Sequence, residues 1–222
     1  MKHSSKISSC CLQPLAGSLR RPSRTIRWTA LGTALLLILL IAAWFWKRPL
    51  SGHGGLPIPG KIEIFVPPFF QEDPRWATDS LGGTEDTLGS SGCAVTSAAM
   101  VLAYYRIPVD PQLLNKYLTE NNGYENSAWV KWEIAATFPP NILEKRYEDL
   151  PSYGLIDCNL LRGNPVIIRI RRQTGRTHFV VIVGKQGFDY LIRDPAPYGM
   201  KGVYPFYELG TAIEALRYFR KN

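Results

Sequence analysis

A cysteine at the start of an apolar segment is the residue best suited to chemistry in this chain. Cys93 follows a Ser/Gly-rich loop, residues 88–92, and begins an apolar run that extends to Tyr105. This pattern predicts a buried helix over residues 93–105, with Ser91 as its N-cap. The unpaired N–H groups and the positive dipole end of a helix N-terminus favour a thiolate over a thiol. Cys93 is therefore a candidate nucleophile.

A nucleophilic thiol needs a base, and His178 is the suitable imidazole. The other histidine after residue 50, His53, lies in a Gly/Pro-rich segment outside the expected core. Two strand-like runs flank residues 184–187, and a three-residue hairpin loop would put Gly187 in the left-handed conformation. That loop would pair His178 with Asp194 across the two strands, and a two-residue loop would place the two diagonally. In either register the carboxylate can orient the imidazole, as nucleophilic catalysis requires.

Each of these residues also has a purely structural explanation. A buried cysteine such as Cys93 is more often a small apolar residue than a nucleophile. A histidine at a strand start is often structural, and an aspartate before proline, as in Asp194-Pro195, often only begins a turn. Their joint occurrence in one domain, in the order that a thiol mechanism needs, favours catalysis.

The basic residues of the chain are concentrated in its first 50 positions. The 222 residues carry a formal net charge of +8. Residues 1–50 contain eight Lys/Arg and no Asp/Glu, so the remainder holds 18 basic and all 18 acidic side chains. The part expected to fold therefore has no net charge that would attract nucleic acid, and we expect no nucleic-acid partner.

An uncharged stretch from Trp28 to Trp46 predicts one transmembrane helix. Its 19 residues would span roughly 28 Å, close to the thickness of a bilayer core. Six Lys/Arg precede it and two follow closely, so the positive-inside rule places the N-terminus in the cytoplasm and the rest outside. We expect a single-pass anchor in a bacterial inner membrane.

The sequence disfavours two other interpretations of this N-terminal segment, a cleaved signal peptide and a lipoprotein. A cleaved signal peptide usually has an apolar region of about 7–15 residues and ends in small residues, whereas this run is longer and ends in Trp44-Phe45-Trp46. A lipoprotein would need its cysteine after the apolar run, and Cys10 and Cys11 precede it.

The chain thus divides into a basic cytoplasmic tail (1–27), a transmembrane helix (28–46), a Gly/Pro-rich linker (47–60) and one domain (61–222). Helices are expected before strands within the domain, and this segregation predicts an α+β fold. The expected helices are 93–105, 110–119, about 127–137 and 155–161; the expected strands are 62–66, 166–171, 179–183, 188–193 and 201–207.

Seven segments of the domain, taken together, carry a family resemblance. They are residues 71–77, 81–82, 90–105, 110–115, 122–124, 178–184 and 194–196. This combination resembles the papain-like cysteine peptidases related to the double-glycine bacteriocin-processing peptidases, in their stand-alone subgroup. The resemblance covers roughly residues 62–205 and implies a papain-like fold, with the nucleophile at a helix N-terminus packed on an antiparallel sheet.

The resemblance also implies a role for each site residue. Cys93 matches the nucleophile, His178 the general base and acid, and Asp194 the residue that orients the imidazole. Gln71 matches the glutamine whose amide forms an oxyanion hole with the Cys93 backbone N–H. An uncharged N–H donor suits a site where negative charge develops on a carbonyl oxygen. Gln71 lies 22 residues before Cys93, a spacing found in stand-alone relatives and longer than in bacteriocin-processing transporters.

We therefore expect a membrane-anchored, extracytoplasmic cysteine peptidase that acts on a peptide or protein substrate through a thioester. One membrane span cannot translocate a substrate, so trimming of double-glycine leader peptides is not expected. No cofactor is expected, and one histidine with two cysteines leaves little to build a metal site from. Three alternatives stay open: a thiol acyltransferase, a non-catalytic module that binds peptide or cell wall, and a Cys93–Cys158 disulfide in an oxidising compartment.

Overall fold

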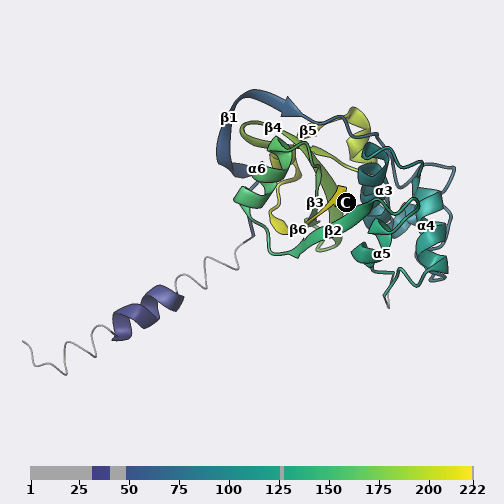
Figure 1. The fold of residues 1–222 in the computed structure, drawn as a ribbon, viewed down its shortest axis with the longest axis horizontal. Helices are drawn as coiled ribbons and strands as arrows, with labels where there is room; N and C mark the ends of the chain where they lie inside the picture. Colours follow the sequence, from purple (N-terminus) through teal and green to yellow (C-terminus); the bar gives the residue numbers. More distant parts are fainter. Residues whose placement is uncertain (1–31, 41–48, 126–127, 222) are drawn as a thin grey trace, which may run out of the picture. The chain divides into compact units, whose positions relative to one another are not determined.

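The computed structural model describes residues 32–40, 49–125 and 128–221 (Figure 1). The chain separates into two units, residues 1–46 and 47–222. In the first unit residues 32–40 are helical. No helix within the described ranges combines the length and apolarity that a membrane crossing requires. The predicted span at 28–46 extends past the described residues at both ends, so the anchor stays a prediction.

The second unit is built on one antiparallel sheet, which confirms the predicted α+β class. The strand order is β1 (His53–Glu63), β4 (Thr177–Arg193), β3 (Val166–Arg171), β6 (Ile213–Lys221) and β2 (Leu143–Asp149), with β5 (Tyr204–Pro205) paired to β4. The helices are α2 (Leu88–Ser91), α3 (Cys93–Tyr104), α4 (Pro111–Glu120), α5 (Trp132–Ala136) and α6 (Tyr153–Leu161), with short 3₁₀ turns at η1 (Pro197–Lys201) and η2 (Phe206–Leu209).

The sheet separates two apolar clusters because successive side chains of a strand point to opposite faces. Val181 and Ile167 belong to the cluster that contains α3, whereas Val180 and Ile168 belong to the cluster that contains residues of α6. Helix α3 is buried along most of its length, from Cys93 to Leu102, which explains its almost continuous apolar sequence. Helices α3, α4 and α5 lie on one side of the ribbon view and α6 on the other (Figure 1).

Helix α3 begins at Cys93, as predicted, but its cap differs from the prediction. Ser91 is the last residue of the short helix α2, and its hydroxyl donates to Asp86 at 2.9 Å. Gly92 is the N-cap of α3 and has no side chain to cap with. A Cβ at Gly92 would lie 2.4 Å from the Leu88 carbonyl oxygen. The two helices can therefore join at this angle only through glycine.

Strand β4 folds back on itself. Seventeen extended residues would span more than about 50 Å. Yet His178, near the start of the strand, and Asp194, directly after its end, are hydrogen-bonded at 2.7 Å. Gly187 has φ of +58°, the left-handed conformation predicted for it at this turn. The hairpin predicted from the Gly-Lys-Gln-Gly sequence thus brings its two ends together.

Strand β1 curves around this turn of β4 (Figure 1). Glu63 pairs with Gly184 before the turn, and His53 pairs with Asp189 after it. Residues 53–60, assigned to a linker from their Gly/Pro content, therefore belong to the sheet. The linker prediction is wrong there because glycines also permit the irregular pairing of a strongly bent strand.

A buried ion pair joins β4 to α6, and its carboxylate also binds the backbone of β1. Lys185 Nζ lies 2.7 Å from Asp157 Oδ1, and the Tyr190 hydroxyl donates to the same oxygen at 2.8 Å. The backbone N–H of Leu56 donates to Asp157 Oδ2 at 2.6 Å. A Cβ at Gly55 would lie 2.2 Å from that oxygen. Any residue other than glycine at position 55 would therefore clash with the Asp157 carboxylate.

The other predicted elements agree with the structure to different degrees. Helix α4 begins after Asp110, whose side chain caps Leu113 at 2.8 Å, as the Asp-Pro pair predicts. The helix predicted at about 127–137 is present only as α5, and the strand predicted at 201–207 only as the two residues of β5. Strands β2 and β6 were not predicted.

Candidate active site

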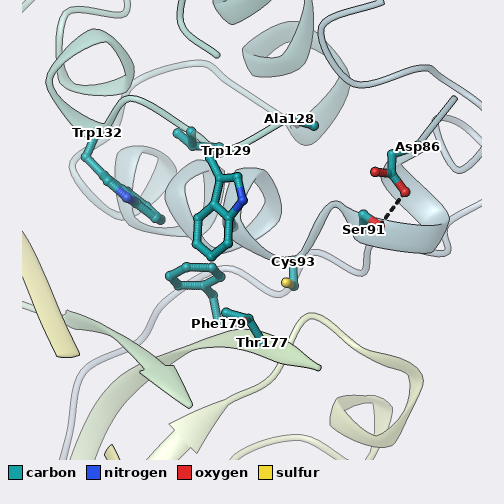
Figure 2. A pocket seen from close by; sticks show the side chains of 10 residues that line it. Asp86, Ser91, Cys93, Ala128, Trp129, Trp132, Thr177 and Phe179 are labelled. Carbon is teal, nitrogen blue, oxygen red and sulfur yellow. Dashed lines mark hydrogen bonds between the residues drawn. The ribbon is translucent and has the colours of Figure 1, made fainter. Parts of the chain in front are cut away.

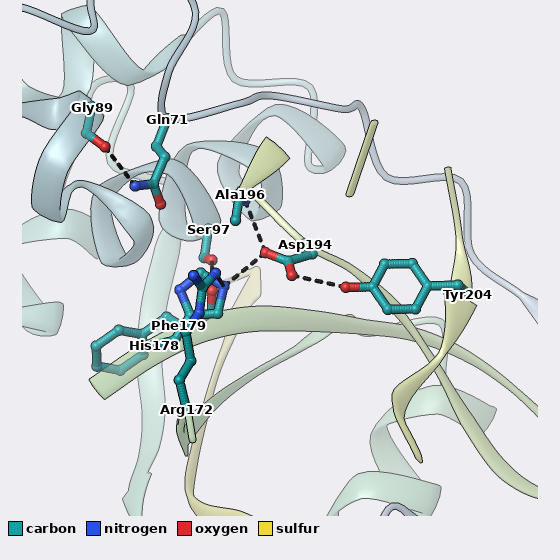
Figure 3. Close-up of polar contacts among 9 residues, drawn as sticks. All are labelled: Gln71, Gly89, Ser97, Arg172, His178, Phe179, Asp194, Ala196 and Tyr204. Atoms are coloured by element: carbon teal, nitrogen blue, oxygen red, sulfur yellow. Dashed lines mark hydrogen bonds and ion pairs between the residues drawn. The ribbon is translucent and has the colours of Figure 1, made fainter. Parts of the chain in front are cut away.

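His178 and Asp194 form a buried pair at the two ends of β4 (Figure 3). His178 Nε2 lies 2.7 Å from Asp194 Oδ1, and the carboxylate is fully buried. Ala196 N–H donates to Oδ1 and the Tyr204 hydroxyl to Oδ2, each at 2.8 Å. Burial alone would raise the pKa of Asp194, but the hydrogen bond from His178, its charge and the other two donors hold the pKa below its usual value. Asp194 is therefore an ionised, fully bonded acceptor.

The bond to Asp194 determines which nitrogen of His178 is free for chemistry. Because a carboxylate can only accept, Nε2 carries the proton, and Nδ1 is left as the second ring nitrogen. Burial lowers the pKa of His178, but hydrogen bonds with Asp194 and with the Cys93 thiol raise it to about 9. An imidazole with that pKa is protonated at neutral pH. It can pair with a thiolate at Cys93, as in thiol catalysis.

Two features of the fold place Cys93 against His178. The thiol is in the first turn of α3, where the N–H groups have no partner within the helix. One turn further on, the Ser97 hydroxyl donates to the Phe179 carbonyl oxygen at 3.2 Å, so α3 is tied to β4 next to the histidine. Cys93 is 8% exposed, and the thiol can therefore be reached from the cavities beside it.

Gln71 is connected to both halves of the site. Its side-chain Nε2 donates to the Gly89 carbonyl oxygen at 2.7 Å, and its backbone N–H donates to the Pro195 carbonyl oxygen at 2.9 Å. In a continuous helix the Gly89 carbonyl would accept from the N–H of Cys93; here Gln71 occupies it (Figure 3). The amide keeps a second N–H, while its Oε1 is buried without a partner among the described residues.

Two cavities meet at Cys93, since both are lined by Ser91, Cys93 and Thr177. The first, about 170 Å³, has aromatic walls from Trp129, Trp132 and Phe179 (Figure 2). The second, about 250 Å³, is polar and is lined by the side chains of Gln71, Ser90, Arg172, Thr174, Arg176 and His178. A substrate chain can therefore cross Cys93 from an apolar side to a polar side.

The four residues selected from the sequence are thus together in the structure. Cys93, His178 and Gln71 line one cavity, and Asp194 lies directly behind His178. Comparison with known proteins assigns the family of the domain, since the model of the Peptidase_C39 like family matches residues 63–220. The chain belongs to the Peptidase_C39 like family. This confirms the resemblance found in the sequence and supports a papain-like cysteine peptidase.

Two solved structures resemble this family member. One is a C39-like peptidase from Bacillus anthracis, with 19% identity and a TM-score of 0.47 over 74% of this chain and 100% of that chain. The other is a double glycine motif protease from an AMS/PCAT transporter, in complex with its leader peptide. It has 20% identity and a TM-score of 0.42, over 74% of this chain and 100% of that chain. No curated protein matches the chain.

The structure contradicts the disulfide alternative for this Peptidase_C39 like chain. Cys93 and Cys158 are both free thiols, and their helices pack on opposite faces of the sheet. His53 is paired with Asp189 at 2.7 Å, where β1 meets the second half of β4. In the part of the chain that the structure describes, no group of three or more His, Cys, Asp or Glu residues could hold a metal ion.

Several residues of the site were not predicted from the sequence. Trp129, which is 46% exposed, and Trp132 both line the cavity beside Cys93. Tyr204, which bonds Asp194, and Arg172, which faces His178, lie in segments with no motif of their own. Their positions depend on how β5 and the β3–β4 turn dock onto β4, and no local pattern signals such docking.

Proposed function

We propose that the chain is a membrane-anchored, extracytoplasmic cysteine peptidase that hydrolyses peptide or amide bonds with Cys93 as nucleophile. One observation carries the proposal. Cys93 and His178 line the same cavity, and His178 Nε2 is bonded to the buried, ionised Asp194. This is the order of nucleophile, base and orienting group that thiol catalysis uses. Family membership over residues 63–220 supports the same chemistry.

The reaction would proceed in two steps. The Cys93 thiolate attacks the carbonyl carbon, and the oxyanion accepts hydrogen bonds from the backbone N–H of Cys93 and the second N–H of Gln71. His178 then protonates the leaving amine, and the acyl group remains on Cys93 as a thioester. Next, His178 takes a proton from water, which attacks the thioester. A second oxyanion forms, and its collapse breaks the C–S bond, which releases a carboxylic acid and restores the Cys93 thiolate beside protonated His178.

The anchor and the external location rest on the sequence. The uncharged segment at 28–46 and the excess of Lys/Arg before it support an N-terminus in the cytoplasm and a catalytic domain outside. An external protease added to spheroplasts should degrade the domain, and alkaline washing should leave the intact chain in the membrane pellet. Protection of the domain until the membrane is lysed would contradict this location.

Peptide cleavage by the full chain in detergent tests the proposed chemistry. A mixture of synthetic peptides is incubated with the wild type, with Cys93→Ala and with Cys158→Ala, and new termini are identified by mass spectrometry. Cys158→Ala is the matched control, since this thiol lies on α6, away from the site. We expect cleavage by the wild type and the control only, with a normal thermal unfolding curve for Cys93→Ala. Unchanged cleavage by Cys93→Ala would contradict the proposal.

A further inference from the structure

Two arginines reach the polar cavity from the turn between β3 and β4. Arg172 and Arg176 both line this cavity, together with Cys93 and His178. The turn is closed by hydrogen bonds from Arg172 N–H to the Arg176 carbonyl oxygen at 2.9 Å and from Gly175 N–H to the Arg172 carbonyl oxygen at 2.8 Å. The two side chains therefore start from a fixed backbone beside the reacting thiol.

These two arginines differ from their neighbours in having no acidic partner. Arg169 and Arg171, on the adjacent strand, both pair with Glu214, at 3.5 and 3.0 Å. Within the residues that the structure describes, neither Arg172 nor Arg176 has a carboxylate partner, and no Asp or Glu lines their cavity. The polar side of the cleft thus carries two arginines without a carboxylate partner next to Cys93.

The contact between Arg172 and His178 leaves the guanidinium without an acceptor. Its terminal nitrogen is 2.9 Å from His178 Nε2, the same atom that lies 2.7 Å from Asp194 Oδ1. Since Nε2 donates its proton to Asp194 and a guanidinium can only donate, the two nitrogens meet as donors. Arg172 therefore gains nothing from this contact and can turn toward an anion that enters the cavity.

We propose that Arg172 and Arg176 bind a carboxylate of the substrate, so that the enzyme prefers peptides with an acidic group close to the bond that is cut. Guanidinium groups bind carboxylates in a forked, charge-assisted geometry, which also fixes the position of the bound group. The carboxylate can be an Asp or Glu side chain or the C-terminus of the substrate. This inference rests on the proposed peptidase function, because it concerns substrate placement over Cys93.

Two alkylating reagents of nearly the same size test the carboxylate site without any turnover. Iodoacetate carries a carboxylate next to its reactive carbon, and iodoacetamide carries a neutral amide in its place. The rate of iodoacetate divided by the rate of iodoacetamide at Cys93 is measured in the full chain in detergent. The same ratio at Cys158 is the internal reference. We expect the ratio to fall roughly tenfold in the double variant Arg172→Gln/Arg176→Gln, the order of one charge-assisted hydrogen bond at a partly exposed site.

Arg171→Gln is the matched control. It removes one positive charge from the same turn region, but from an arginine that Glu214 already pairs with. This control should change the rate ratio less than about twofold if the effect is local rather than a long-range charge effect. An unchanged ratio in the double variant, with a normal iodoacetamide rate, would overturn the proposed carboxylate site and leave the proposed nucleophile unaffected. If neither reagent modified Cys93, the proposed nucleophile itself would be wrong, and this inference with it.

Matched peptides then identify the source of the carboxylate. Pairs that differ only by Glu or Gln near the cleaved bond test a side chain, and pairs with a free or an amidated C-terminus test the terminal group. A preference of the wild type for the acidic member of either pair, lost in Arg172→Gln/Arg176→Gln, supports the proposal. Equal cleavage of both members of both pairs by the wild type would overturn it while leaving the peptidase function intact.

Discussion

His178 Nε2 is hydrogen-bonded to Asp194 Oδ1 at 2.7 Å, although the two residues are 16 positions apart at opposite ends of one folded strand. The contact fixes the tautomer of the imidazole and leaves Nδ1 for the thiol. It also makes the geometry of the site dependent on the turn at Gly187, since that turn brings the ends of β4 together. The chemistry of the site is therefore built into the fold of β4.

Replacing Asp194 should distinguish its role in orienting the His178 imidazole from its role in the stability of the fold. Asp194→Ala removes the acceptor for Nε2, and we expect kcat/KM to fall roughly 100-fold, in the range of a general acid–base contribution. Loss of buried hydrogen bonds should also lower the unfolding free energy by about 1–3 kcal/mol. Asp194→Asn retains an oxygen for Nε2 and should lose less activity.

Tyr204→Phe is the control for this series. It removes only the donor to Asp194 Oδ2 and leaves the bond to His178 in place. Its kcat/KM should stay within about tenfold of the wild type, because the Tyr204 hydroxyl donates to the carboxylate oxygen that does not contact His178. Wild-type activity of Asp194→Ala would show that orientation of the imidazole by Asp194 is not needed.

The pKa of His178, raised to about 9, predicts the alkaline limit of activity. The protonated imidazole must be present to protonate the leaving amine, so kcat/KM should fall as the pH rises through about 9. A pH profile of a peptide cleaved by Cys93 checks this. An alkaline limb near pH 6.5, the ordinary pKa of histidine, would show that the interactions with Asp194 and Cys93 do not raise it.

Gln71 can be tested as an oxyanion donor separately from its role in packing. Gln71→Ala should lower kcat by roughly 100- to 1,000-fold, the usual loss for one such donor. Alkylation of Cys93 by iodoacetamide forms no oxyanion and should keep nearly its wild-type rate. If kcat and the alkylation rate fell together, Gln71 would act mainly by positioning Cys93, through its hydrogen bonds to Gly89 and Pro195.

The junction between α2 and α3 should tolerate no side chain. A Cβ at Gly92 would meet the Leu88 carbonyl oxygen at 2.4 Å, so Gly92→Ala must move the first turn of α3. We expect a loss of about 1–3 kcal/mol in unfolding free energy and a strong loss of Cys93-dependent activity. Thermal or denaturant unfolding measures the first and peptide cleavage the second.

Gly154 in α6 provides the matched control for this substitution. A Cβ there would have its nearest contact, the Ser152 hydroxyl, at 3.8 Å, so Gly154→Ala creates no clash. Alanine in a helix costs less conformational entropy than glycine, and this variant should be neutral or stabilised by up to about 1 kcal/mol. Equal stability of the Gly92 and Gly154 variants would contradict the close approach at the junction.

Local chemistry explains what could be predicted from the sequence. The helix start at Cys93, the Asp110-Pro111 cap and the left-handed glycine at position 187 each depend on a few neighbouring residues, and the structure confirms all three. Residues 88–91 form the helix α2 instead of the predicted loop. The contact between His178 and Asp194 was predicted from the turn, because a hairpin turn brings the residues on its two sides together. Ser91 was assigned the wrong role because the sequence does not show that α2 continues almost directly into α3.

Non-local pairing explains what could not be predicted. Strand β2 has a highly charged sequence, Leu143 to Asp149, and is a strand because β6 pairs with it. The Gly/Pro-rich residues 53–60 are a strand because they pair around the turn of β4. Arg172 and Tyr204 reach the site for the same reason: distant segments dock there. Sequence periodicity reports burial along one segment and carries no information about its partners.

The rate of thiol alkylation tests the central claim most directly, because it needs no known substrate. The full chain is treated with iodoacetamide at pH 7, and modification of Cys93 and Cys158 is followed by mass spectrometry. We predict that Cys93 reacts at least about tenfold faster than Cys158, because a paired imidazolium and a helix N-terminus favour its thiolate. We also predict that His178→Ala removes most of this difference. Equally slow modification of both cysteines in the wild type would contradict Cys93 as an activated nucleophile.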